Sequence, residues 1–88
     1  LFAPEAICQF WMGDYEKSLQ TFKKVKVKKN YLFYIALAHK KNGEDELAAE
    51  KLKEAHAMTG MDNDSFIGSQ PFNNEEKLSE LKGILDSI

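Results

Sequence analysis

The chain has 88 residues, 43% of them apolar and 30% charged, a composition typical of one globular domain and not of a disordered segment. Its net charge of −2 excludes a general electrostatic attraction to nucleic acid or membranes, and all twelve basic residues are lysine. It therefore lacks arginine, the side chain best suited to bidentate recognition of phosphate. No apolar run approaches the roughly 20 residues of a membrane-spanning helix, and no signal peptide is visible.

The first predicted helix covers about residues 4–12. Pro4 is tolerated in a first helical turn, Glu5 suits the positive N-terminus, and Gly13 is a typical stop signal. Cys8 is the only cysteine, so it cannot form an internal disulfide, which favours a reducing, cytoplasmic compartment. The apolar face of this helix would consist of Ile7, Phe10 and Trp11.

The second predicted helix covers about residues 14–27, with Asp14 as its N-cap. Its end lies in a run of five lysines within the seven residues 23–29. One interpretation of this run is a solvated helix C-terminus, where the helix dipole favours cations. The other is a patch for nucleic acid or an acidic partner. We favour the first interpretation.

The third and fourth predicted helices cover about residues 30–42 and 45–59, with Asn30 as the N-cap of the third. Apolar residues occur nearly all round the third helix, which indicates that it is covered on several sides. Gly43 and Gly60 follow the two helices as stop signals. The residues of the fourth helix predicted to face inward are Leu47, Ala48, Leu52, Ala55 and Met58.

Residues 61–74 are polar and rich in turn formers, and they predict a linker with one short helical turn near 64–69. Asp62 and Asp64 match the start of a calcium-binding loop. Ile67 and Asn73 occupy the positions that require glycine and glutamate, so we reject a calcium site.

The last predicted helix lies within residues 75–88 and has Asn74 as its N-cap. Leu78, Leu81, Leu85 and Ile88 form one apolar stripe on an otherwise polar helix. Helical-repeat proteins need terminal elements with a polar outer face, and this helix fits that role as a cap. We expect Leu81 and Leu85 to be buried against the helix at 45–59.

Two stretches of the chain are similar to one another. Gly13 and Gly43, 30 residues apart, open them, and a small residue stands five positions later in each, Ser18 or Ala48. A large apolar residue stands four positions further on, Phe22 or Leu52. Self-similarity at a fixed period is the sequence signature of repeat architectures.

These stretches resemble the tetratricopeptide (TPR) repeat, whose 34-residue pattern is W-x2-L-G-x2-Y, then A-x3-F, then P. Ser18-x3-Phe22 and Ala48-x3-Leu52 match the A-x3-F part. No proline closes either repeat, and the spacing of 30 residues is four short of the family period. The first part of the pattern falls, in the second copy, on Leu32, Ile35, Ala36 and His39.

The resemblance implies an all-α fold of antiparallel helix-turn-helix repeats. Two TPR-like hairpins would occupy residues 1–60, a linker residues 61–74, and a C-terminal capping helix residues 75–88. The residues implied to pack the repeats are Tyr15, Ser18, Phe22, Leu32, Ile35, Ala36, Ala48 and Leu52.

The resemblance also implies a concave groove lined by the first helix of each repeat. An aromatic wall with a lysine rim would suit an extended or helical peptide that carries acidic residues. The alternative is that the aromatic residues belong to a core beneath a missing upstream repeat, and both interpretations stay open at this point. The candidate groove residues are Phe10, Trp11, Phe33, Tyr34, Leu37, Lys40 and Lys41.

The chain begins at Leu1 and not at methionine, so we expect it to be the C-terminal fragment of a longer protein. Pro71-Phe72, Asn74 and the leucine stripe of the last helix are similar to the tail that follows TPR arrays in some bacterial nucleotide cyclases and winged-helix regulators. That resemblance implies a regulatory segment of such a protein.

No pattern in the chain predicts catalysis, a cofactor or a metal. His39, His56 and Cys8 lack the spacing of metal ligands, and no phosphate-binding loop or nucleophile motif occurs. We therefore expect a non-enzymatic protein–protein interaction or regulatory module, with a protein or peptide partner and no membrane partner. The alternative is a lysine-rich helical domain that binds nucleic acid or an acidic partner. We also expect a homodimer through the first helix, whose free edge would expose Phe2, Ile7, Phe10 or Trp11.

Overall fold

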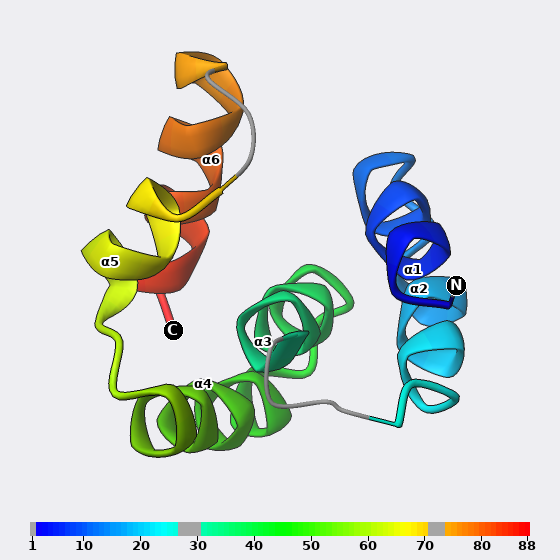
Figure 1. Ribbon diagram of the computed structural model, residues 1–88. Helices are drawn as coiled ribbons and strands as arrows, with labels where there is room; N and C mark the ends of the chain where they lie inside the picture. Colours follow the sequence, from blue (N-terminus) through cyan, green and yellow to red (C-terminus); the bar gives the residue numbers. More distant parts are fainter. Residues whose placement is uncertain (1, 27–30, 71–73) are drawn as a thin grey trace.

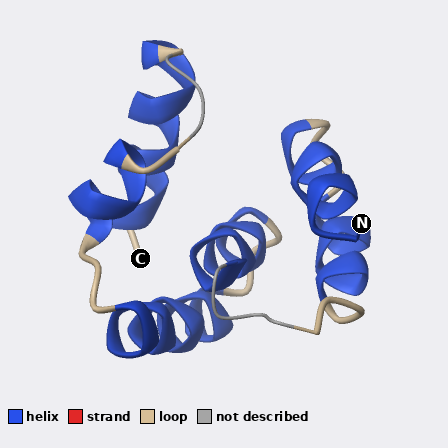
Figure 2. Ribbon diagram, viewed as in Figure 1, coloured by secondary structure: helices blue, strands red, loops and turns tan. Residues whose placement is uncertain are grey.

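The computed structural model describes residues 2–26, 31–70 and 74–88, and this part of the chain is all-α, as predicted (Figures 1 and 2). Its six helices are α1 (Phe2–Trp11), α2 (Tyr15–Phe22), α3 (Leu32–Lys41), α4 (Asp45–Thr59), α5 (Asn63–Gly68) and α6 (Glu75–Asp86).

The turns after α1 and α3 have the same geometry. Gly13 and Gly43 adopt left-handed backbone conformations, with φ of 87° and 80°. In each turn the glycine N–H donates to a carbonyl three residues back, and the next N–H donates to one five residues back. This is the Schellman arrangement, in which a residue without Cβ satisfies the last carbonyls of a helix. Each turn leads directly into the next helix, so α1–α2 and α3–α4 form two helical hairpins (Figure 1).

Helix α2 is shorter than the predicted range of 14–27 and ends at Phe22. The Lys23 N–H still donates to the Leu19 carbonyl four residues back, whereas those of Lys24 and Val25 donate to carbonyls three residues back, which tightens the chain into a turn. Residues 27–30, including the predicted cap Asn30, lie outside the described residues. Asp14 is not a side-chain cap, because its carboxylate accepts no hydrogen bond at this helix start.

The caps of the two C-terminal helices are formed by side chains. Asn74 accepts a hydrogen bond from the Lys77 N–H at 3.0 Å, which confirms the predicted N-cap of α6. Asp62 accepts one from the Ser65 N–H at 2.7 Å and thereby caps α5, the short helical segment predicted near 64–69.

The three small residues predicted to pack the repeats have no solvent exposure. Ser18 on α2, Ala36 on α3 and Ala48 on α4 are fully buried, and the Ser18 hydroxyl donates to the Ala6 carbonyl at 2.7 Å. The other residues predicted to pack the repeats are buried or, for Tyr15, partly buried. Leu47 and Met58 on α4 were expected to face inward, but they are 40% and 52% exposed, so that expectation was wrong.

Helix α3 occupies the centre of the molecule and packs against α2, α4 and α6 (Figure 1). Its residues 32–38 are all buried, as its unbroken apolar sequence predicts. Leu81 and Leu85 of α6 are also buried, at 0% and 1% exposed. Helix α6 packs chiefly on α3 and α5, and not on α4 as expected. Its position follows from α5, whose Phe66 stacks on Phe33 of α3 and carries the C-terminal segment over that helix.

Candidate interaction site

The candidate groove residues of α1 and α3 form part of a buried aromatic cluster. Phe10 meets Trp11 and Tyr34 edge-on, with ring centroids 5.2 and 5.8 Å apart. Phe33 stacks on Phe66 at 4.4 Å, and Tyr34 meets the same ring edge-on at 5.5 Å. Such pairs stabilise a core by about 0.5–1.5 kcal/mol each beyond the burial of their area. The cluster thus joins α1, α3 and α5.

Burial favours the core interpretation of these aromatic residues over the open groove. Phe10, Phe33 and Tyr34 are 3%, 1% and 4% exposed, and Leu37 is fully buried. Helices α5 and α6 provide cover for α3, where the sequence had suggested a missing upstream repeat. In this conformation the predicted groove is occupied by the chain itself.

Two polar contacts hold this cover in place. The Tyr34 hydroxyl donates to the Gln70 side-chain carbonyl at 2.7 Å. Burial raises the pKa of Tyr34 to about 12, and a hydrogen bond that the hydroxyl accepts from the Trp11 side chain opposes that rise. Lys77 of α6 lies over the Trp11 ring, 5.1 Å from its centroid. The tyrosine therefore stays protonated and able to donate throughout the physiological pH range.

The two lysines of the candidate groove, at the end of α3, contact neighbouring residues of the chain. The Lys40 Nζ lies 3.1 Å from an Asp45 carboxylate oxygen at the start of α4. The Lys41 Nζ lies over the Tyr15 ring, 5.8 Å from its centroid. Four of the seven candidate residues are therefore buried, and both lysines have partners within the chain.

The face of α1 proposed for dimerisation is largely turned inward. Phe10 is buried, Ile7 and Trp11 are partly buried, and the side chain of Phe2 lies outside the described part. The homodimer stays a prediction, and burial of Phe10 removes one of the aromatic groups that it invoked.

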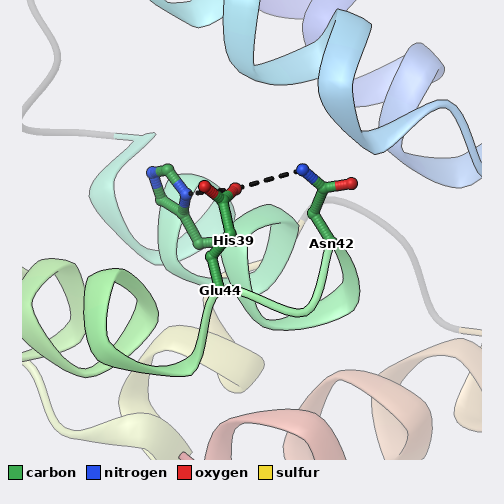
Figure 3. A network of polar contacts seen from close by, with 3 residues as sticks. All are labelled: His39, Asn42 and Glu44. Atoms are coloured by element: carbon green, nitrogen blue, oxygen red, sulfur yellow. Dashed lines mark hydrogen bonds and ion pairs between the residues drawn. The ribbon is translucent and has the colours of Figure 1, made fainter.

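A polar network closes the turn between α3 and α4 (Figure 3). One Glu44 carboxylate oxygen lies 3.2 Å from His39 Nδ1 and accepts a hydrogen bond from the Asn42 amide at 3.1 Å. Asn42 first, then His39 and the positive charge of Lys23, lower the pKa of Glu44. The network thus stabilises the ionised carboxylate and links this turn electrostatically to the end of α2.

Among the described residues, this histidine does not belong to a cluster of metal-ligating side chains. Cys8 is exposed on α1, and no group of three or more His, Cys, Asp or Glu side chains in the described part is placed to hold a metal ion. Nor does the described part contain a helix that is long and apolar enough to cross a membrane. The network of His39, Asn42 and Glu44 therefore serves to stabilise the turn between α3 and α4.

A notch opens where α2, α3 and α4 meet. It has a volume of about 250 Å³ and is lined by apolar side chains together with His39, Lys23 and Lys51. Sequence reasoning missed this site, although two signals for it exist. The repeat spacing is four residues short of the TPR period, and the lysine run begins at the notch.

A second, more polar depression lies between the end of α4 and the C-terminal helices. His56 contacts the Asn63 side chain at 2.8 Å, and Lys82 pairs with Asp64 at 3.1 Å. The hydrogen bond from Lys82 to Asp64 raises the lysine pKa. These contacts connect α4, α5 and α6 across the surface, so we assign them to the attachment of the tail.

The chain matches no protein-family model, no curated protein and no solved structure in comparisons with all three. The candidate site consequently rests on the geometry of the chain itself.

Proposed function

We propose that this chain is a non-enzymatic interaction module of the TPR-like helical-repeat type. One observation carries the proposal. The turns at Gly13 and Gly43 repeat the same hydrogen bonds 30 residues apart, and each leads to a fully buried small residue, Ser18 or Ala48. Repeated helical hairpins of this kind create extended surfaces that bind other proteins.

The C-terminal helices support a regulatory role for the same module. Phe66, Leu81 and Leu85 are buried together with the apolar residues of α3, so α5 and α6 close one face of the hairpins. A closed face leaves the remaining surface of the hairpins as the region for a partner. We propose that the chain acts as an interaction or regulatory module, like the segment of nucleotide cyclases and winged-helix regulators that its tail resembles.

A second candidate function is binding of nucleic acid through the lysines at the end of α2. Lys23, Lys24 and Lys26 are exposed there. Binding through phosphate contacts would weaken steeply with salt and be sequence-independent. Replacement of Lys23, Lys26 and Lys28 would abolish it.

Selection from a random peptide library displayed on phage tests the main proposal without knowledge of the natural partner. We expect a consensus peptide that binds the purified chain at one saturable site in calorimetry. A ten-nucleotide oligothymidine serves as the comparison ligand. If no peptide binds saturably, or if the oligonucleotide alone binds with a steep salt dependence, the interaction-module proposal is refuted.

A further inference from the structure

The notch between the hairpins results from the shortness of α2. Helix α2 has 8 residues and α4 has 15, a difference of about 10 Å at roughly 1.5 Å per residue. The last turn of α2, with Leu19 and Phe22, therefore forms one wall and does not continue alongside α3. Leu32 and Ile35 of α3 form the floor.

The size and lining of the notch suit a single anchoring side chain. Its volume of about 250 Å³ lies just below the roughly 300–1,000 Å³ typical of small-molecule pockets. The aliphatic side chains of Leu19, Leu32 and Ile35 offer an apolar surface for a leucine-like group. They do not offer the flat, exposed aromatic face on which nucleic-acid bases stack.

Lysines flank this apolar surface from two helices. Lys23 stands on the α2 side and Lys51 on the α4 side. The Nζ of Lys51 lies 3.3 Å from Glu54, but this pair is half-exposed and lies within one helical turn, and exposed pairs of this type contribute little to stability. Lys51 is therefore able to exchange that partner for a carboxylate of a bound molecule.

The charge of the surrounding chain also favours an acidic ligand at the notch. Between Glu16 and Glu44 the sequence contains eight lysines and no acidic residue, although the chain as a whole has a net charge of −2. This segment supplies two of the three notch walls. Its electrostatic field favours the approach of acidic partners and disfavours basic ones.

We propose that the notch is the docking site for an acidic peptide segment of a partner protein, which inserts one apolar anchor residue while flanking carboxylates contact Lys23 and Lys51. This site rests on the proposed interaction function and specifies its surface and the chemistry of its partner. The anchor fills the space left by the short helix α2, and the carboxylates set the orientation of the segment.

The test uses the whole 15N-labelled chain and the capped peptide EDELLDE, followed by NMR. Saturable shifts are expected for residues around the notch, together with intermolecular contacts between the peptide leucine methyls and those of Leu19 and Ile35. The peptide EDESSDE, which keeps the charges and lacks the anchor, should not bind.

Charge-reversal variants separate this site from general electrostatics. We expect the double variant Lys23→Glu, Lys51→Glu to weaken binding by about tenfold, because attraction at two exposed pairs becomes repulsion. The matched control Lys17→Glu, Lys53→Glu has the same net charge and changes exposed lysines that do not line the notch. It should weaken binding by less than about twofold, since screening at physiological salt limits longer-range effects.

Four outcomes would overturn the proposal. The first is that millimolar EDELLDE causes no chemical shift changes, and the second is that both double variants weaken its binding equally. The third is that EDESSDE binds as tightly as EDELLDE, and the fourth is that oligothymidine displaces EDELLDE. Self-association of the chain through the notch, seen in sedimentation, would identify a second copy as the occupant and also contradict it. If library-selected peptides bind but produce no shifts at the notch, the docking site fails while the interaction function stands.

Discussion

The contact between Phe66 and Phe33 gives the sharpest test of how the C-terminal segment is held. Phe66 is 3% exposed and stacks on Phe33 at 4.4 Å, with the rings inclined by 14°. It also meets Tyr34 edge-on at 5.5 Å. Helix α5 has only six residues, and Phe66 is its one buried side chain. We therefore expect Phe66→Ala to detach α5 and to loosen α6 with it.

The expected loss is large relative to the stability of so small a protein. Substitution of a buried phenylalanine by alanine costs about 3–5 kcal/mol, whereas a chain of this length has a free energy of unfolding of about 4–13 kcal/mol. With a urea m value of about 2 kcal/mol per molar, the midpoint should fall by about 2 M. Phe66→Leu keeps most of the volume, so its cost should be below about 1.5–2 kcal/mol.

The fluorescence of Trp11 reports whether α5 and α6 detach. Trp11 is the only tryptophan, and Lys77 of α6 lies 5.1 Å from its ring centroid. In the wild type, Trp11 fluorescence and far-UV circular dichroism should report one coincident unfolding transition. Ile67→Ala, at the partly buried next position on α5, serves as the matched control and should cost less. If Phe66→Ala and Ile67→Ala lower the midpoint equally, or if neither lowers it, the stacked pair does not hold the tail.

Four further predictions concern other elements. Ala48→Leu should cost about 1–3 kcal/mol through overpacking, whereas Ala49→Leu, at the exposed next position, should leave the thermal midpoint nearly unchanged. Leu81→Ala should cost about 2–5 kcal/mol in urea denaturation, because its side chain is fully buried. Asn74→Ala should cost about 1 kcal/mol through loss of the α6 cap and should reduce amide-exchange protection in the first turn of that helix. The pKa of Glu44 is lowered in the folded chain, so its ionised form contributes stability that is present above the usual carboxyl range and is lost as pH falls through the lower folded value. The difference in urea midpoint between wild type and Glu44→Gln should therefore shrink as pH falls below about 4.

The helices could be predicted because their signals are local. Glycines at 13, 43 and 60 end three helices in left-handed conformations, and an L-residue with a side chain rarely adopts them. The Asn74 cap and the apolar stripe of α6 are equally local features. The early end of α2 was missed because the lysine- and valine-rich segment after Phe22 has no helix-stopping glycine or proline. Tightened turn hydrogen bonds end the helix there instead.

The position of the tail depends on contacts between residues far apart in the chain. The apolar residues all round α3 predict that several elements cover it, but they do not identify those elements. Phe66 and Phe33 are 33 positions apart, and their stacking decides that α6 covers α3 and not α4. The short repeat spacing and the lysine run are signals for the notch, but they do not locate it, since its position requires both the observed length of α2 and its placement beside α3.

The burial of the aromatic cluster argues for the notch as the site where a partner binds. To reach Phe33 and Tyr34, a partner would have to displace Phe66, Leu81 and Leu85, all 3% exposed or less. At about 2 kcal/mol for each buried side chain, that displacement would oppose binding by about 6 kcal/mol. Since each 1.4 kcal/mol is tenfold, affinity at the aromatic face would fall by a factor of about 10⁴. Leu32 and Ile35 in the notch are also buried, at 5% and 7% exposed, but they border an open volume of about 250 Å³, so a side chain can contact them without displacing a helix. A partner that binds at micromolar strength or better should therefore select the notch, and deletion of the tail should not be needed to observe it.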